Sequence, residues 1–211
     1  MRGRLLTGTL ALGLLALLWS GVLPRLAPGP FSAHMVVHMG VVAVVAPLLA
    51  FALAGSGLDP VRGHPARLPA LPLTAVEFMV VWGWHLPVLH HAARAGGMAL
   101  LLEQGSFLLA GLAVWMSALG GDAAERAGRA AVGTVALLLT SMHMTLLGAL
   151  LGLAPRPLYH AGAARAALRD QQVGGALMLG VGGVVYLVAG VALTAALLGG
   201  RRVRHPMEEA S

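Results

Sequence analysis

Six stretches of this chain are long and apolar enough to form membrane-spanning helices, and they constrain the fold more than any other feature of the sequence. A spanning helix needs about 20 largely apolar residues, because in hydrocarbon its backbone groups must bond to one another. The segments between the stretches contain Pro, Gly and Arg, which stop helices. The predicted spanning helices cover residues 4–23, 31–53, 73–90, 98–119, 129–151 and 170–198. We therefore predict an all-α fold, a polytopic transmembrane bundle of about six helices that forms one integral-membrane domain over residues 1–211.

The composition supports a membrane protein and excludes several kinds of site. Of the 211 residues, 58% are hydrophobic and 10% are charged, whereas soluble domains are about 25% charged. The absence of cysteine excludes disulfides, thiolate metal sites and cysteine nucleophiles. All 14 basic residues are arginines in short loops or near helix ends, where they set topology, so the net charge of +6 does not indicate nucleic-acid binding. Because hydrolase and phosphate-binding motifs are also absent, we expect no enzyme.

The distribution of arginines predicts the orientation of the helices. With the N-terminus inside, nine arginines fall at the inner ends and five at the outer ends. Because positive loops stay in the cytoplasm, we predict a multi-pass protein of the bacterial inner membrane with both termini inside. Three arginines in the outer loop 154–169 oppose this orientation unless that loop forms an interfacial amphipathic helix. Residues 4–23 also resemble a cleavable signal peptide, whose removal would not invert the other helices.

Four histidines lie inside the apolar segments, and the predicted topology puts them all in the outer half of the membrane. They are His34, His38, His85 and His143. Ionisable groups at this depth are costly and usually functional. The spacing of four puts His34 and His38 on one helix face, and Met35 and Met39 repeat that spacing on the adjacent stripe. Imidazole together with thioether is a ligand set suited to copper.

Two carboxylates are predicted to reach the same depth. Glu103 lies in the second turn of the fourth predicted helix, and Asp170 opens the sixth. The candidate metal site on the periplasmic side therefore comprises His34, His38, His85, Met35, Met39, Glu103, His143 and Asp170.

Each member of this set also has an ordinary structural interpretation. A lone membrane histidine can bond a carbonyl across helices, an aspartate can cap a helix, and methionine can fill gaps in packing. His90, His91 and His160 are interpreted as loop or interface residues. Pro87 removes a backbone hydrogen bond and predicts a kink just after His85.

Four short motifs occur in an order typical of one family of membrane proteins. They are S-A-H-M-V-V-H-M followed by A-P-L-L, then W-G-W-H-L-P, then L-L-E-Q-G-S-F-L-L-A-G-L-A-V-W, and finally D-Q-Q-V-G-G-A-L-M. They resemble the H-M-x-x-H-M and P-P-L-L, W-H-x-P, E-H-x-x-F and D-Q-x-x-G-G-x-x-M motifs of the CtaG family, the polytopic assembly factors of caa-type cytochrome c oxidase. The resemblance covers about residues 31–178.

The resemblance implies a role in maturing the oxidase by delivering or inserting copper. Carried over residue by residue, it covers His34, His38, His85, Glu103 and Asp170. The chain departs from the family pattern at Gln104, which replaces the histidine of E-H, and at Leu100, where an upstream histidine is common. Ala46-Pro47 replaces the family's Pro-Pro.

The leading hypothesis is a copper-binding assembly factor, a membrane chaperone whose partners are cytochrome c oxidase subunits, the lipid bilayer and a periplasmic copper donor. His34, His38 and His85 would bind Cu(I), Met35 or Met39 would add soft ligation, and Glu103 would orient a histidine. One alternative is a b-type cytochrome, with haem b held by His38 and either His85 or His143. Another is a cofactor-free scaffold that grips oxidase subunits through its Gly-rich last helix.

Overall fold

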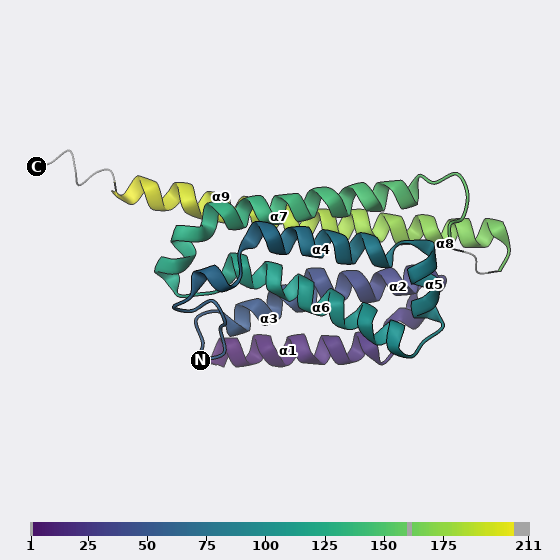
Figure 1. The fold of residues 1–211 in the computed structure, drawn as a ribbon, viewed down its shortest axis with the longest axis horizontal. Helices are drawn as coiled ribbons and strands as arrows, with labels where there is room; N and C mark the ends of the chain where they lie inside the picture. Colours follow the sequence, from purple (N-terminus) through teal and green to yellow (C-terminus); the bar gives the residue numbers. More distant parts are fainter. Residues whose placement is uncertain (1, 160–161, 205–211) are drawn as a thin grey trace, which may run out of the picture.

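The computed structural model describes residues 2–159 and 162–204, which form a bundle of helices and contain no strand (Figure 1). The first half of the bundle comprises α1 (Arg2–Trp19), α2 (Pro30–Met39), η2 (Gly40–Val45), α3 (Ala46–Leu53), α4 (Ala70–Trp84) and α5 (Pro87–Arg94). The second half comprises α6 (Met98–Leu119), α7 (Ala123–Gly152), α8 (Ala164–Leu177), η4 (Met178–Gly182) and α9 (Gly183–Arg204). Two short 3-10 turns, η1 (Pro24–Leu26) and η3 (Pro65–Arg67), lie in the connections. The prediction of an all-α polytopic bundle is confirmed.

Four helices are long and apolar enough to cross a membrane: Pro30–Leu53, Met98–Leu119, Ala124–Gly152 and Ala164–Gly199. The pair α4 and α5 gives a fifth span if the bent pair is counted as one. The sequence predicted about six spans, whereas four or five segments of the described chain are long and apolar enough to span. The difference arises at α1, which is not one of these segments. Arg2 and Arg4 lie in the first turn of α1 and lower its mean hydropathy.

The chain bends by 73° between α4 and α5, so the one helix predicted over residues 73–90 is in fact two. Pro87 is the first residue of α5, and the preceding Leu86 has the extended backbone that a proline imposes on its neighbour. The Tyr159 hydroxyl donates a hydrogen bond of 2.6 Å to the carbonyl of His85, which satisfies an acceptor beside the break. The kink predicted at Pro87 is confirmed, and it is sharp enough to turn α5 across the end of the bundle.

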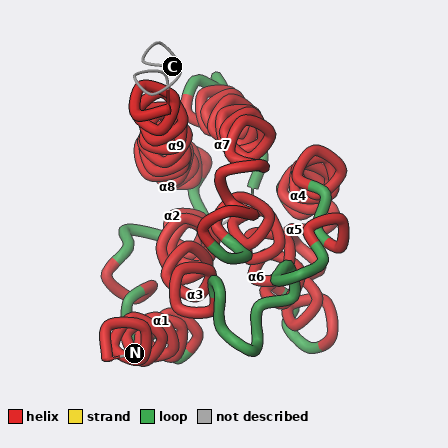
Figure 2. Tube along the Cα trace, turned by 90° about the vertical axis from the view of Figure 1, so that its left-hand side faces the viewer, coloured by secondary structure: helices red, strands yellow, loops and turns green. Residues whose placement is uncertain are grey.

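Two segments of π-helix interrupt the long helices, and one of them organises the centre of the bundle. In η2, the carbonyl of Val42 accepts hydrogen bonds from Trp115 Nε1 at 2.9 Å and from the Tyr186 hydroxyl at 3.0 Å. A π turn alters the regular backbone ladder and so makes a carbonyl accessible to side chains. Side chains from α6 and α9 thereby bond to the backbone in the middle of the span Pro30–Leu53, whose helices α2 and α3 are labelled in the end-on view (Figure 2).

The Gly-rich last span packs closely against α7. A Cβ atom added at Gly148 would lie 2.7 Å from the backbone nitrogen of Leu179, and one added at Gly175 would lie 2.5 Å from that of Gly152. Both distances are too short for any side chain, so glycine is required on both sides of the contact. Small residues thus allow this span to approach α7 closely within the chain itself.

Asp59 fastens the loop between α3 and α4 at the opposite end of the bundle from α5. Its carboxylate accepts hydrogen bonds from the backbone N–H groups of Gly55 at 2.6 Å, Val61 at 2.9 Å and Gly121 at 2.6 Å. Burial alone raises the pKa of Asp59, but these donors and the nearby Arg129 outweigh it, so the pKa lies below its ordinary value.

Replacing Asp59 with alanine is expected to destabilise the protein by about 3 kcal/mol, because three N–H groups, two of them buried, lose a charged acceptor. Thermal unfolding in detergent measures this loss. Since the folded pKa is depressed, the contribution is fully present above the pKa of an unfolded aspartate, about 3.9, and declines as the pH falls through the folded value. This account would be contradicted if the difference in free energy of unfolding between the wild type and the variant increased below about pH 4.

Candidate metal centre

Four buried histidine rings from three helices meet at the end of the bundle where α5 lies. The ring centroids of His34 and His38 on α2 are 6.1 Å apart. The ring of His85, which follows α4, lies 5.4 Å from His34 and 5.3 Å from His38. His90 on α5 lies 4.9 Å from His34. Each residue is at most 5% exposed, so the structure groups these rings in the protein interior.

Most ring nitrogens in this histidine cluster have no hydrogen-bond partner within the described chain. They are both nitrogens of His34 and His38, Nε2 of His85 and Nδ1 of His90. A buried polar atom without a partner is costly, so six of them in one cluster call for an explanation. Each neutral imidazole has one nitrogen with a lone pair, and a bound ion would satisfy that lone pair on each ring.

His85 is oriented as metal-binding histidines commonly are. Its Nδ1 lies 2.6 Å from the carbonyl of Val81, one turn earlier on α4. This contact requires the proton on Nδ1, which leaves the lone pair of Nε2 free. A hydrogen bond that fixes the tautomer and the ring in this way is the usual support of a histidine ligand.

Glu103 on α6 adds a carboxylate to the cluster. Its Oε1 lies 3.7 Å from Nδ1 of His34 and has no hydrogen-bond partner among the described residues. Its Oε2 accepts hydrogen bonds from the Arg94 guanidinium and, at 2.9 Å, from the Gln104 side-chain amide. One ligand atom each from His34, His90 and Glu103 lie within 4.8 Å of one another, close to the spacing of ligands that share an ion.

His90 belongs to the cluster, although from the sequence it was interpreted as an ordinary loop or interface residue. It is five residues after His85, and on a straight helix this spacing would put the two side chains about 140° apart. The bend brings both to one cluster, so Pro87 was the signal that could have found it. The neighbouring His91 is exposed, as expected of an ordinary surface residue, and His160 lies outside the described residues.

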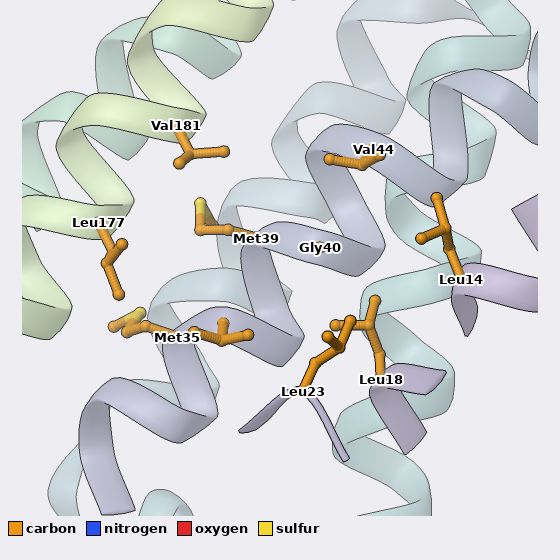
Figure 3. A pocket seen from close by; sticks show the side chains of 10 residues that line it. Leu14, Leu18, Leu23, Met35, Met39, Gly40, Val44, Leu177 and Val181 are labelled. Atoms are coloured by element: carbon orange, nitrogen blue, oxygen red, sulfur yellow. The ribbon is translucent and has the colours of Figure 1, made fainter. Parts of the chain in front are cut away.

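Met35 and Met39 point to a different face of α2 from the histidine cluster. They line an apolar groove of about 280 Å³ together with Leu177 and Val181 (Figure 3). A Cβ atom added at Gly182 would lie 3.1 Å from the sulfur of Met39, so this methionine packs against η4. The geometry therefore gives both methionines a packing role.

Asp170 stabilises α2 and not its own helix. The prediction that it opens the sixth span is wrong, because α8 begins at Ala164. Its carboxylate accepts hydrogen bonds from the backbone N–H groups of Phe31 at 2.7 Å and Ser32 at 3.0 Å, and from the Ser32 hydroxyl. Asp170 thus supplies from α8 the N-terminal cap that Gly29 cannot supply to α2.

His143 belongs to a second polar cluster, formed by Glu77, Thr140, His143 and Tyr186. Glu77 Oε2 accepts a hydrogen bond of 2.7 Å from Thr140 and lies 3.9 Å from His143 Nε2, while Oε1 lies 3.1 Å from the Tyr186 hydroxyl. Glu77 precedes His85 by eight residues, or about 12 Å along a helix. The structure therefore groups His143 with Glu77, about two turns of α4 before His85.

The fold and the cluster together define a polytopic α-helical membrane protein that buries imidazole and carboxylate groups near one end of its bundle. The chain belongs to the cytochrome c oxidase caa3 assembly factor family, Caa3_CtaG, whose model matches residues 1–199. This match confirms the resemblance found in the sequence, and it makes cytochrome c oxidase the partner and assembly the role. No curated protein and no solved structure matches the chain.

Two of the positions at which the chain departs from the family pattern, Gln104 and Leu100, lie on α6. Gln104 accepts a hydrogen bond of 3.2 Å from Trp19 Nε1 and donates one to Glu103, so it links α1 to the carboxylate. Leu100 is 36% exposed, so a side chain at this position lies on the surface of α6.

Proposed function

We propose that this protein binds copper as Cu(I) in the histidine cluster and delivers it to cytochrome c oxidase during assembly. The observation that carries the proposal is the convergence of buried ring nitrogens on His34, His38 and His85 that have no partner among residues 2–159 and 162–204. Copper is the cargo of the protein, so the site has to release the ion as well as bind it. Neutral imidazoles suit such a task, because they bind copper without the permanent charge of a thiolate.

The residues divide the work of binding. His34, His38 and His85 are the primary ligands, and His90 on α5 completes the set. Glu103 Oε1, 3.7 Å from His34 Nδ1, orients that ring when the imidazole proton is on Nδ1. With both termini in the cytoplasm of a bacterium, the cluster lies on the periplasmic side of the inner membrane, where a periplasmic donor can supply copper. The role requires no catalysed reaction.

The packing around the histidines favours a single ion over haem b. The Phe107 ring lies 4.0 Å from the ring of His38, 6.0 Å from His34 and 6.3 Å from His85. Phe107 thus fills space beside the rings that a macrocycle would need. Three glycines of the face proposed for a scaffold, Gly175, Gly183 and Gly190, already pack against α7 and are covered there.

Copper analysis of the purified protein tests the proposal, with His90→Ala and His91→Ala as a matched pair. The wild type is expected to retain copper after exposure to Cu(I) and to show no Soret band. His90→Ala is expected to weaken copper binding roughly 10–100-fold, since a ligand or its close support is lost, while the exposed His91 is dispensable. A wild-type protein that retains no copper, or one that shows a Soret band, would refute the proposal.

A further inference from the structure

Arg94 forms an ion pair with Glu103 at the edge of the histidine cluster. It lies four residues after His90 on α5, so the two side chains share a helix face. The side chain of Glu103 is fully buried, whereas that of Arg94 is 31% exposed. A permanent cation therefore neutralises the Glu103 carboxylate, which lies beside the ring nitrogens.

The arrangement of the two carboxylate oxygens allows this ion pair to persist when an ion binds. Arg94 and Gln104 both bond to Oε2, whereas Oε1 is the oxygen near His34 and has no partner in the described chain. An ion held by the histidines can therefore approach Oε1 without displacing Arg94. The positive charge of Arg94 consequently acts on the bound ion.

The charge of the cluster determines the cost of adding an ion. Neutral imidazoles contribute no charge, and the charges of Glu103 and Arg94 cancel. An entering ion thus leaves its whole charge in the interior, one unit for Cu(I) and two for Cu(II) or Zn(II). Burying net charge is costly, and the cost rises steeply with the charge.

We propose that Arg94 determines the specificity of the cluster: by neutralising Glu103, it makes the histidines select a soft monovalent cation over divalent ones. This inference rests on the proposed function, because it assumes that the cluster binds a metal ion. Arg94 is a specificity-determining residue and not a ligand.

Arg94→Gln tests this inference, because it removes the charge and keeps a polar side chain. The repulsion between a fixed charge and an ion is proportional to the charge of the ion. Affinity is therefore expected to rise roughly tenfold for Ag(I), a redox-inert substitute for Cu(I), and roughly a hundredfold for Zn(II). The selectivity for the monovalent ion falls about tenfold. Competition against chromogenic chelators in lipid nanodiscs measures both affinities.

Two control variants separate charge from structure. Arg94→Lys keeps the charge and is expected to keep the selectivity. Arg25→Gln removes an exposed arginine from η1, near the same end of the bundle, and is expected to leave both affinities unchanged. Glu103→Gln provides an independent reversal, because it leaves Arg94 uncompensated and should weaken Zn(II) binding more than Ag(I) binding.

The possible outcomes distinguish this inference from the proposed function. If Arg94→Gln raised both affinities by one factor, Arg94 would merely compete for the carboxylate and the inference would be overturned. If Glu103→Gln did not lower the preference for Zn(II), it would be overturned even where Arg94→Gln failed to fold. If the wild type bound neither ion, the proposed function itself would fail.

Discussion

A protein in which both His34 and His38 are replaced with alanine is expected to leave cytochrome c oxidase deficient in copper when external copper is low. Both side chains are buried on α2, and together they supply four of the ring nitrogens that lack partners in the part of the chain that the structure describes. Loss of a supporting group typically costs 10–100-fold in metal affinity, so loss of two ligands should cost more. The copper content and activity of the oxidase in isolated membranes measure the effect, normalised to the amount of the variant protein.

The adjacent methionines provide the matched control for this experiment. Met35→Leu and Met39→Leu change the side chains next to the histidines while roughly conserving volume. Because both methionines face the groove lined by α8 and η4, copper loading is expected to stay normal. A double-histidine variant that still produced fully loaded oxidase at low copper would show that the protein acts as a scaffold. Loss of loading in the leucine variants would restore the methionines to the ligand set.

Replacing Asp170 with alanine is expected to destabilise the protein by about 3 kcal/mol and to weaken metal binding as a consequence. Two N–H groups at the start of α2 lose their acceptor, the Ser32 hydroxyl loses one of its two acceptors, and the negative charge that favours a helix N-terminus disappears. His34 lies in the second turn of α2, so fraying of this end displaces a ligand. Asp170→Asn keeps an acceptor and should have about half the effect.

Asp122 offers a control of the same chemistry at the other end of the bundle. It is the N-cap of α7 and accepts a hydrogen bond of 3.0 Å from the backbone of Glu125. Asp122→Ala should cost about 1 kcal/mol, and metal affinity should remain unchanged. Thermal unfolding in detergent and metal titration measure both variants. If Asp170→Ala retained full stability but lost metal binding, Asp170 would be a ligand after all.

The sequence was sufficient where one local pattern determines the outcome. Apolar stretches of about 20 residues predict the class of fold, and the spacing of His34 and His38 predicts a shared helix face. Pro87 likewise predicts the break after His85, because the pyrrolidine ring of a proline clashes with the preceding turn of a helix.

The rest of the candidate site depends on how helices pack, which no local pattern records. The role of Asp170 depends on α8 lying beside the start of α2, and the grouping of His143 with Glu77 depends on α7 lying beside α4. Neither of these contacts could be predicted from the sequence alone. The ion pair of Arg94 with Glu103 was likewise not predicted, because it requires α5 to turn back toward α6.

The break after α4 also has a consequence for the lipid around the protein. With 15 residues, α4 extends only about 22 Å, whereas the hydrocarbon core of a bilayer is about 30 Å thick. Beyond its end, the chain turns along α5 and exposes Leu86 and Val88, which are 57% and 79% exposed. Such a mismatch is accommodated by local thinning of the bilayer, at a modest cost for each ångström. We therefore expect the headgroup layer to be drawn inward beside α5, and water to come closer to His85 and His90 than in an undistorted bilayer.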